Sequence, residues 1–529
     1  MFELERIPAG LSKAKNAPLL TGILRGTERE CLRVRADATL ALTPHPAGLG
    51  SALTHPMITT DFSESLLEFI TPPTHSVDDL LASLGVIQRI AIDELGDELL
   101  WTSSMPCRLG DDEDIPVARY GSSNNGMMKT IYRVGLGHRY GRAMQTVSGV
   151  HYNFSLPNAF FAYMLNEDHS LDDLQTFRDK YYFNLIRNFR RHYWLLVYLF
   201  GASPALCSSF VAGRSHDLTT LGAGDTLYHP YATSLRMGDL GYQSTAQESL
   251  YVCYDSKRSY VASLCNAITR PHPEYDRIGL KDQHGNYLQL NTSLLQIENE
   301  FYNAIRPKRT TRPGETALTA LANRGVEYIE VRCLDITPFD PLGLTREQIY
   351  FLDTFLLYCA LIPSPPSSPE ESALILKNQK AVVNTGRKAG TELEHAYHGV
   401  MPLTTWGRDL LNALQPVAAL LDNVNHGSEH QASVELQLAK IGDCERTPSA
   451  RLLREVETSG GDYTRYMLAQ SRHHMEEFKA VPVPEREQVR FAALARKSLQ
   501  EQRALEQKAS PGFDEYLAEY YQQYKVCKC

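Results

Sequence analysis

The sequence predicts an α+β fold in which helices pack on one face of a largely antiparallel sheet and a helical C-terminal region follows. In residues 1–362, short strand-like runs alternate with helical stretches but lack the regular crossover spacing of a parallel sheet. Residues 361–369 (LIPSPPSSP) form a proline- and serine-rich loop that no helix interior or central strand would tolerate. In residues 370–529 the patterns are overwhelmingly helical. We therefore expect an α+β core over 1–362 and a mainly helical supporting region over 370–529.

Composition narrows the class of protein. The chain has 529 residues, of which 43% are hydrophobic and 22% charged, as in ordinary folded globular proteins. The formal net charge of −9 is a mild argument against nonspecific nucleic-acid binding. No apolar run is long enough to span a bilayer, and residues 1–6 do not resemble a signal peptide. We expect no nucleic-acid partner and no membrane partner.

The ten cysteines show no C-x-x-C spacing, and most lie in apolar segments. This usage is typical of a reducing compartment, so we expect a cytoplasmic protein. Cys527 and Cys529 lie near the end of the chain without any accompanying zinc-site spacing. We therefore expect no metal site there.

Residues 326–335 (VEYIEVRCLD) give the strongest strand signal and carry charges on one face. Successive side chains of a strand point to opposite faces, so an apolar face that contains Ile329 and Val331 leaves Glu330 and Arg332 on the other. A semi-buried carboxylate and guanidinium need partners. A ligand that bears ions would satisfy both.

Three earlier stretches, 26–34, 59–71 and 147–155, repeat this pattern. Each places acidic or imidazole side chains opposite an apolar face, or within an apolar run. Taken singly, each is better explained as the solvated face of an antiparallel sheet. Their recurrence favours one shared site. The residues concerned are Glu28, Glu30, Asp61, Glu68 and His151.

Helical periodicity fills the segments between the strands. It predicts a helix over 78–99 and one long helix over 170–200 that ends at the run 201–204 (GASP). In the C-terminal region it predicts helices over 451–479 and 484–508.

The familiar phosphate-binding loops are absent: there is no G-x-x-x-x-G-K-[ST] motif and no strand-linked G-x-G-x-x-G motif. Any nucleotide would then be held by hard cations on carboxylates and by basic side chains. Magnesium takes oxygen ligands and keeps several waters. The five carboxylates Glu28, Glu30, Asp61, Glu68 and Glu330 are too many for one such ion, which implies two or more.

Residues 305–314 (IRPKRTTRPG) supply four cations in a segment bounded by prolines, which predicts a basic loop. Alone, such a run is a solvated loop about as often as a binding site. Beside an acidic metal site, phosphate binding by Arg306, Lys308 and Arg309 becomes the better interpretation. Residue type adds weaker pocket candidates, namely Tyr132, Arg133, Gln145, Arg236 and Tyr242.

Six stretches carry a resemblance to a known family. They are 26–34 (GTERECLRV), 53–55 with 58–62 (LTH, ITTDF), 67–72 (LEFITP), 148–155 (SGVHYNFS), 198–204 (YLFGASP) and 327–332 (EYIEVR). Through them the sequence resembles the proteobacterial type of glutamate-cysteine ligase, from about residue 19 to about residue 355 and more loosely beyond. The resemblance implies a glutamine-synthetase-like catalytic core, whose antiparallel sheet forms a funnel that ATP enters from one side and amino acids from the other.

The resemblance also implies roles for individual residues. The expected Mg²⁺ ligands, with Mn²⁺ as an alternative ion, are Glu28, Glu30, Asp61, Glu68, His151 and Glu330. Arg332 is expected to meet the transferred phosphoryl group, and Arg236 to clamp a substrate carboxylate. The residues expected around the cysteine pocket are Phe62, Tyr132, Leu136, Gln145, Tyr242 and Tyr302. Nothing functional is carried over to residues 370–529.

The implied reaction is the first step of glutathione biosynthesis. ATP phosphorylates the γ-carboxylate of L-glutamate, and the amino group of L-cysteine attacks the resulting acyl phosphate. We expect a monomer that uses these three small-molecule substrates. The choice of cysteine rests on the resemblance, so another acceptor amine stays open.

Two other classes also stay open. A metal-dependent hydrolase would use the same carboxylates and His151 but would not need the basic segment 305–314. A non-catalytic nucleotide or amino-acid sensor on this fold would bind ATP with magnesium and turn nothing over.

Overall fold

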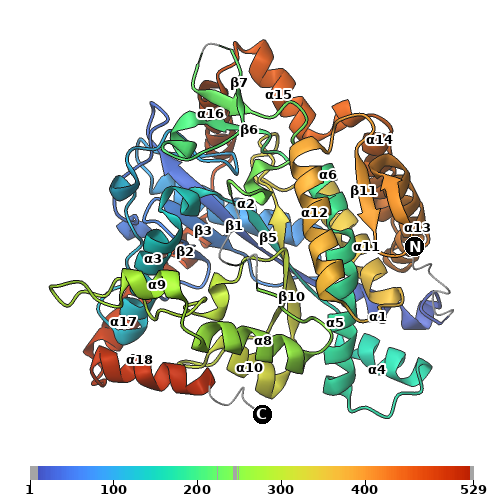
Figure 1. Cartoon of the computed structure of the whole chain (residues 1–529), viewed down its shortest axis with the longest axis horizontal. Helices are drawn as coiled ribbons and strands as arrows, with labels where there is room; N and C mark the ends of the chain where they lie inside the picture. Colours follow the sequence, from blue (N-terminus) through green and yellow to red (C-terminus); the bar gives the residue numbers. More distant parts are fainter. Residues whose placement is uncertain (1–9, 223, 242–246, 248–249, 525–529) are drawn as a thin grey trace.

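The computed structural model describes residues 10–222, 224–241, 247 and 250–524, and its centre is an antiparallel sheet (Figure 1). Six strands form its main path in the order β2-β3-β1-β5-β10-β9, and the short β4 pairs with one end of β1. Every pairing in the sheet is antiparallel, which confirms the predicted fold class. The strands are β1 Leu24–Val34, β2 Ile58–Thr60, β3 Leu66–Ile70, β4 Leu99–Leu100, β5 Val150–Ser155, β9 Ile305–Lys308 and β10 Tyr328–Leu334.

The register of the sheet brings the charged residues of separate strands together. Glu28 of β1 lies opposite His151 of β5. Glu30 lies opposite Glu68 of β3. Glu330 of β10 lies opposite Asn153 of β5 and Arg306 of β9. Because side chains at paired positions share a face, one side of the sheet becomes ionic.

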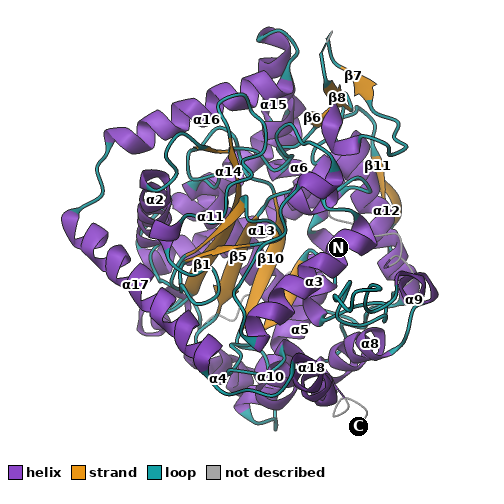
Figure 2. Cartoon of the chain, turned by 90° about the vertical axis from the view of Figure 1, so that its left-hand side faces the viewer, coloured by secondary structure: helices purple, strands orange, loops and turns teal. Residues whose placement is uncertain are grey.

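The other face of the sheet is apolar and is covered by helices (Figures 1 and 2). Tyr152 and Phe154 of β5 and Val331 of β10 are buried there in one large cluster with α5 Leu174–His192, α6 Trp194–Phe200 and α11 Arg346–Leu361. The single helix predicted over 170–200 is divided into α5 and α6 at Tyr193. The backbone there stays close to helical, with φ −67° and ψ −14°, and the Tyr193 N–H still donates to the Phe189 carbonyl at 2.8 Å.

Local sequence explains where two of the surrounding helices begin. The helix predicted from residue 78 is α2 Val77–Asp93, and the Ser76 hydroxyl before it accepts a hydrogen bond from the Asp79 N–H. α11 starts with a capping box between Thr345 and Gln348. The other α-helices among the described residues of this half are α1 Pro18–Thr21, α3 Asn124–Tyr140, α4 Asn158–Glu167, α8 Lys257–Thr269, α9 Pro273–Ile278 and α10 Ala317–Arg324. A small second sheet holds β6 Ala205–Cys207, β7 Thr219–Thr220 and β8 Thr226–Tyr228.

The basic segment that was predicted to be a loop begins as a strand. Residues 305–308 form β9, the edge strand next to β10, and only residues 309–314 leave the sheet. Pro307 is tolerated there because an edge strand need not donate a hydrogen bond on its outer side. The strand fixes Arg306 directly opposite Glu330.

The C-terminal region is mainly helical, as predicted, with one small hairpin that the sequence did not predict. Its elements are α12 Pro369–Thr385, β11 Glu392–His395, β12 Gly399–Pro402, α13 Leu403–Asn425, α14 Glu429–Gly442, α15 Pro448–Thr458, α16 Tyr463–Ala480, α17 Glu485–Gln507 and α18 Phe513–Gln522. The helix predicted over 451–479 is split into α15 and α16 because Gly460 and Gly461 both take positive φ, at 107° and 79°. α17 matches its predicted span closely.

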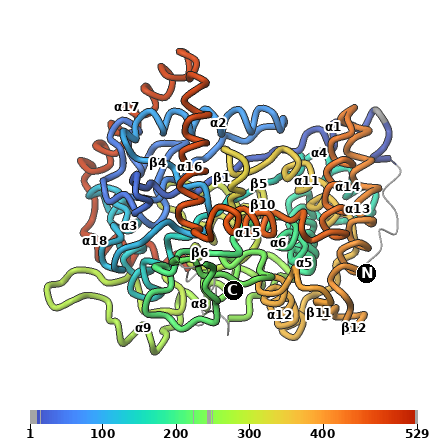
Figure 3. Tube along the Cα trace, turned by 90° about the horizontal axis from the view of Figure 1, so that it is seen from above, coloured from blue at the N-terminus to red at the C-terminus, as the bar shows by residue number. Residues whose placement is uncertain are grey.

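These helices wrap around the core instead of forming a separate layer. Figure 2 shows α16 and α17 along the outside of the molecule, and Figure 3 shows α17 and α18 on the same side as α2 and α3. α17 is fixed to the N-terminal half by Ser498, whose hydroxyl accepts a hydrogen bond of 3.0 Å from the Ser51 N–H. None of the described helices is both long and apolar enough to cross a membrane.

The cysteines follow the expectation of a reduced chain with one exception. The free cysteines within the described residues are Cys31, Cys107, Cys207, Cys253, Cys333, Cys359 and Cys444. Cys265 is disulfide-bonded, contrary to that expectation. Cys527 and Cys529 lie outside the described residues.

Candidate active site

A cleft of about 660 Å³ lies on the ionic face of the sheet. Its walls come from β1, β2, β3, β5, β9, β10 and α3, from the segments 144–147, 297–302 and 311–317, and from Tyr520. We call this cavity the cleft. Of the predicted site residues, it is lined by Glu28, Glu30, Asp61, Phe62, Glu68, Tyr132, Leu136, Gln145, His151, Tyr302, Arg306, Lys308, Glu330 and Arg332.

A cluster of two carboxylates and an imidazole forms the centre of the cleft. One ligand atom from each of Glu28, His151 and Glu330 lies within 4.8 Å of the others. His151 Nδ1 is 3.3 Å from Glu28 Oε2 and 3.7 Å from Glu330 Oε1, and its Nε2 is 3.5 Å from Glu30 Oε1. Glu330 is completely buried and His151 is 3% exposed. The cluster follows directly from the strand register.

Burial raises the pKa of the carboxyl groups in this cluster, and neighbouring charges decide the net direction. Burial acts to raise the pKa of Glu330, but nearby cations outweigh it. The largest of these effects comes from the Lys308 ammonium, and the pKa lies well below its usual range. For Glu68, burial and then the Glu28 carboxylate raise the pKa well above the usual value. Burial also raises the pKa of Glu30. A divalent cation would relieve the repulsion around Glu30 and Glu68.

These residues fit a hard divalent cation. Carboxylate oxygens are the ligands that Mg²⁺ and Mn²⁺ prefer. The buried Nε2 of His151 makes no hydrogen bond to any described residue, and it faces Glu30. Asp61 and Glu68 line the same cavity and add further carboxylates. The cleft therefore offers ligands for more than one ion.

Basic side chains flank Glu330. Lys308 Nζ is 3.3 Å from Glu330 Oε1, and Arg332 Nη1 is 3.1 Å from Glu330 Oε2. Arg306 also lines the cleft, with its Nε donating to Asn303 Oδ1 at 2.9 Å. Positive charge therefore stands where a phosphate group would meet the carboxylate cluster.

Two predicted residues do not reach the cleft wall. Arg309 turns to the surface, where its Nε lies 3.7 Å from Glu327 Oε2. Arg236 is 1% exposed and lies beneath the wall, where its Nη2 donates to the Arg332 carbonyl at 3.2 Å and its Nη1 is 3.8 Å from Asp335 Oδ1. A Cβ on Gly149 would lie 1.9 Å from the Arg236 guanidinium, so this approach requires glycine at position 149.

The two ends of the cleft are defined by α3, which runs along it. Near one end, Leu136 and Phe62 belong to the same apolar cluster. Near the other end, Met128 shares a cluster with Ile297 and with Leu517 of α18. Met128 and Leu136 are eight positions apart, which corresponds to about 12 Å of helix.

The first end gathers the residues that were expected around the cysteine pocket. Phe62, Leu136 and Tyr132 line it, and Gln145 Nε2 donates to the Tyr302 hydroxyl at 3.0 Å. Tyr242 lies outside the described residues. We call this part the acceptor end and the part beside α18 the distal end.

Sequence reasoning missed several residues that line the cleft. Lys129 stands one helical turn before the candidate Arg133, and the i, i+4 spacing could have found it; burial lowers its pKa to about 8. Thr311 and Glu315 follow β9. Tyr520 comes from α18, and no pattern in the sequence connects it with the strands.

The chain is similar to known proteins along nearly its whole length. Residues 9–382 match the sequence family described as glutamate-cysteine ligase. The chain is 62% identical over 527 residues to the glutamate–cysteine ligase of Saccharophagus degradans, a match that covers 100% of this chain and 99% of that protein. It is 50% identical over 517 residues to the glutamate–cysteine ligase of Pseudomonas aeruginosa strain LESB58, covering 98% and 97% respectively.

Solved structures with similar folds agree. A crystal structure of glutamate–cysteine ligase from Francisella tularensis in complex with AMP has a TM-score of 0.90 and 36% identity, and the match covers 96% of this chain and 98% of that one. A bifunctional glutathione synthetase from Pasteurella multocida has a TM-score of 0.66 and 25% identity, and covers 90% of this chain and 54% of that one.

Proposed function

The chain belongs to the glutamate–cysteine ligase family, and we propose that the cleft is the place where ATP, L-glutamate and L-cysteine react. The protein is an ATP-dependent ligase of the first step of glutathione synthesis. The observation that carries the site assignment is the buried cluster of Glu28, His151 and Glu330 with Lys308 and Arg332 beside it. An acidic metal-type cluster flanked by cations is what phosphoryl transfer from ATP requires.

The residues proposed to hold Mg²⁺, or Mn²⁺ in its place, are Glu28, Glu30, Asp61, Glu68, His151 and Glu330. Two or more ions bound there would neutralise phosphate charge and template the transfer. Burial raises the pKa of Glu30 and of Glu68, so protons compete with a metal ion for these two carboxylates and metal binding should weaken as the pH falls. The pKa of Glu330 lies well below its usual range, so its carboxylate is ionised at neutral pH and can bind a cation without losing a proton.

The cations next to Glu330 are proposed to stabilise the charge that gathers on the phosphoryl group. Arg332 is held 3.1 Å from Glu330 and Lys308 is held 3.3 Å from it, so both need little rearrangement when phosphate arrives. Arg306 adds a third positive charge on the same wall. Arg236 is proposed to act from beneath the wall, where it fixes the backbone of Arg332.

The acceptor end is proposed to bind L-cysteine. Its mixed wall of Phe62, Tyr132 and Leu136, with the Gln145–Tyr302 pair, offers apolar contact and hydrogen-bonding groups. A γ-glutamyl phosphate formed at the cluster would then face the amine, and the surrounding side chains would exclude water. The distal end is proposed to take the nucleoside of ATP.

The remaining proposals concern the whole chain. We propose that the enzyme acts as a monomer in the cytoplasm, because one chain supplies all the proposed metal and phosphate ligands. Residues 370–529 are proposed to support the core, although α18 also supplies Tyr520 to the cleft.

The test is phosphate release from ATP with L-glutamate, Mg²⁺ and a panel of acceptor amines that includes L-cysteine, L-serine and L-2-aminobutyrate. We expect release to require glutamate and an acceptor, with L-cysteine giving the highest kcat/KM and γ-glutamylcysteine identified by mass spectrometry. Release that needs no acceptor would indicate a hydrolase. Binding of ATP without any turnover would indicate a sensor.

A further inference from the structure

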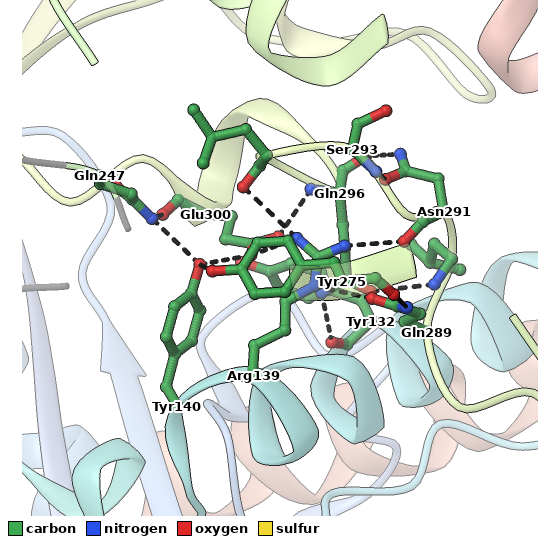
Figure 4. A network of polar contacts seen from close by, with 12 residues as sticks. Tyr132, Arg139, Tyr140, Gln247, Tyr275, Gln289, Asn291, Ser293, Gln296 and Glu300 are labelled. Atoms are coloured by element: carbon green, nitrogen blue, oxygen red, sulfur yellow. Dashed lines mark hydrogen bonds and ion pairs between the residues drawn. The ribbon is translucent and has the colours of Figure 1, made fainter. Parts of the chain in front are cut away.

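A closed polar network lies behind the acceptor end of the cleft (Figure 4). Its centre is the ion pair between Arg139, in the last turn of α3, and Glu300, in the short 3-10 turn 298–300. Arg139 Nη1 lies 2.8 Å from Glu300 Oε1, and both side chains are completely buried. Neither residue lines the cleft. Burial of two charges costs free energy unless their polar atoms are satisfied, so the pair needs an explanation.

The Arg139 side of the network is closely satisfied. Its Nε donates to Gln289 Oε1 at 2.9 Å, and its Nη2 donates to the Asn291 carbonyl at 2.7 Å. The guanidinium also lies over the ring of Tyr275, 4.1 Å from the centroid. Hydrogen bonds at two edges of the planar guanidinium and the ring contact on its face together fix its orientation.

The Glu300 side is equally constrained. Its Oε1 accepts a second hydrogen bond, of 2.7 Å, from the Tyr140 hydroxyl, and its Oε2 accepts one of 2.7 Å from the Gln296 N–H. The Tyr140 oxygen in turn accepts a hydrogen bond of 3.2 Å from Gln247 Nε2. Burial and the Glu300 carboxylate raise the pKa of Tyr140 well above its usual value, so its hydroxyl stays protonated as a donor.

This network holds the backbone of two residues that do line the cleft. Gln296 Nε2 donates to the carbonyl of Tyr132 at 3.1 Å. Gln247 Oε1 accepts from the N–H of Tyr302 at 3.1 Å, while its Nε2 donates to the Glu300 carbonyl at 2.8 Å. Tyr132 and Tyr302 belong to segments far apart in the sequence. Within the described residues, the side chains of this network connect the backbone of Tyr132 to that of Tyr302.

We propose that the Arg139–Glu300 network is a positioning unit for the acceptor amino acid. It fixes the separation between Tyr132 and Tyr302 and therefore the width of the acceptor end. The inference rests on the proposed function in one respect, that the acceptor binds between these tyrosines. Displacements of about 1 Å in positioning groups can cost about 100-fold in rate. None of the proposed metal or phosphate ligands belongs to this network, so we expect loss of the network to affect the acceptor much more than ATP.

Glu300→Gln and Tyr140→Phe test this proposal. Glu300→Gln removes the charge that orients Arg139, and Tyr140→Phe removes one hydroxyl while it keeps the aromatic ring. We expect both to raise KM for the acceptor amine by about tenfold or more, with KM for ATP changed by less than about twofold. The acceptor used is whichever amine the wild type prefers. A preference for an amine other than cysteine would therefore overturn the proposed acceptor without affecting this test.

The matched control is Glu371→Gln in the buried Arg191–Glu371 pair, which joins α5 to α12 at 2.7 Å and does not line the cleft. It removes the same charge from the same kind of pair. We expect it to lower Tm without changing either KM. If the Glu300 and Tyr140 variants behave like this control, or raise both KM values equally, the network is only structural and the proposal is wrong. Should Glu300→Gln fail to fold, Tyr140→Phe decides the outcome.

Discussion

Glu330 is the residue where the proposed cation-binding and phosphate-binding parts of the cleft meet. His151 approaches one oxygen of its completely buried carboxylate, together with Lys308, and Arg332 approaches the other. A carboxylate in this position bridges the proposed metal ligands and the proposed phosphate ligands. Its neighbour Glu327, at the start of the same segment, has a side chain that is 43% exposed and pairs with Arg309 at the surface.

Glu330→Gln should leave the fold intact and reduce turnover by about 100-fold or more, because a ligand of the proposed metal site loses its charge. The Mg²⁺ concentration that gives half-maximal rate should also rise. A thermal melt tests whether the fold is intact, and a magnesium titration of the rate measures turnover and the half-maximal Mg²⁺ concentration. Glu327→Gln, the same substitution at a surface position of the same segment, is the control. Activity near the wild-type value at ordinary Mg²⁺ would remove Glu330 from the metal site.

Arg332→Lys separates catalysis from simple charge neutralisation. Lysine keeps the positive charge but lacks the planar fork that grips two oxygens at once, so an interaction made chiefly in the transition state should weaken. We expect kcat to fall by much more than KM for ATP or glutamate rises. If Arg332 only neutralises Glu330 as a buried pair, the variant should instead show a lower Tm with intact kcat per folded molecule.

For single residues, the sequence predicted which face of a strand each side chain occupies. The faces of 326–335 and 147–155 were predicted correctly because side-chain direction in a strand has a period of two. Arg236, which was predicted to clamp a substrate carboxylate, lies beneath the cleft wall, where it pairs with Asp335. A contact between residues about a hundred positions apart leaves no mark in the local pattern.

Among the described elements of the C-terminal region, α18 is the one that contributes a residue to the cleft, Tyr520. Tyr524, just after this helix, donates a hydrogen bond to Glu298, and Gln523 Oε1 accepts one of 3.1 Å from the Thr316 N–H. Glu298 Oε1 in turn accepts from the Leu318 N–H near the start of α10. These bonds fix Tyr520 at the distal end.

Tyr520→Ala should raise KM for ATP by about tenfold, with little change in KM for the amino acids, because the lost ring lines the end proposed for the nucleoside. Tyr516→Ala on the same helix is the control, since Tyr516 does not line the cleft. Steady-state kinetics with each substrate varied in turn distinguish the two. An equal effect of both substitutions would show that only the stability of α18 matters.

A half-buried lysine between α6 and α14 gives a pH prediction. Lys440 donates to the Leu199 carbonyl at 3.0 Å and lies 4.9 Å from the centroid of the Phe200 ring, and burial lowers its pKa to about 7. In the unfolded chain the pKa is about 10.4. Between these values the unfolded state holds the proton and the folded state does not, so the free energy of unfolding rises with pH.

Lys440→Met removes this dependence. Relative to the wild type, the variant should therefore be most stabilised at about pH 7 and below, and should lose that advantage as the pH approaches about 10. Urea unfolding of both proteins across this range measures the difference. Lys497→Met, at a side chain that is 69% exposed, provides the control. A constant difference between Lys440→Met and wild type would contradict the assignment.

Element boundaries were predictable where local chemistry sets them. The proline–serine run 361–369 separates α11 from α12, and α17 keeps the predicted span. β9 was predicted to be a loop because prolines usually exclude strands, and only its place at the edge of the sheet makes Pro307 acceptable. The β11–β12 hairpin is too short and too exposed to show a strand pattern.

On the scale of the whole molecule, the core and the C-terminal region share one interior. Val382 of α12, Leu410 of α13 and Val434 of α14 are completely buried in the same cluster as Phe351 and Phe355 of α11. We propose that residues 370–529 complete the hydrophobic core of residues 1–362 and do not form an independent unit. The composition change at 361–369 predicted the loop, but it did not predict that apolar residues from both sides of the loop pack in one cluster.

Calorimetry tests this proposal. The whole chain should unfold in a single transition with equal calorimetric and van't Hoff enthalpies, and an isolated fragment 1–362 should lack a cooperative transition, because its α6 and α11 would lose their cover. Urea unfolding followed by two spectroscopic probes provides the second measurement. Two separate transitions in the whole chain would show that the regions are autonomous domains.

Because α18 lines the cleft, the site can be completed only late in the synthesis of the chain. Glu28 is translated roughly 490 residues before Tyr520, which at about 5–20 residues per second corresponds to on the order of half a minute to a minute and a half of synthesis. Once β10 has been made, all the proposed cation ligands are present in the chain, but the distal wall of the cleft still lacks Tyr520. An unfinished chain on the ribosome is therefore poorly equipped to consume ATP. We therefore expect activity only once α18 has been made.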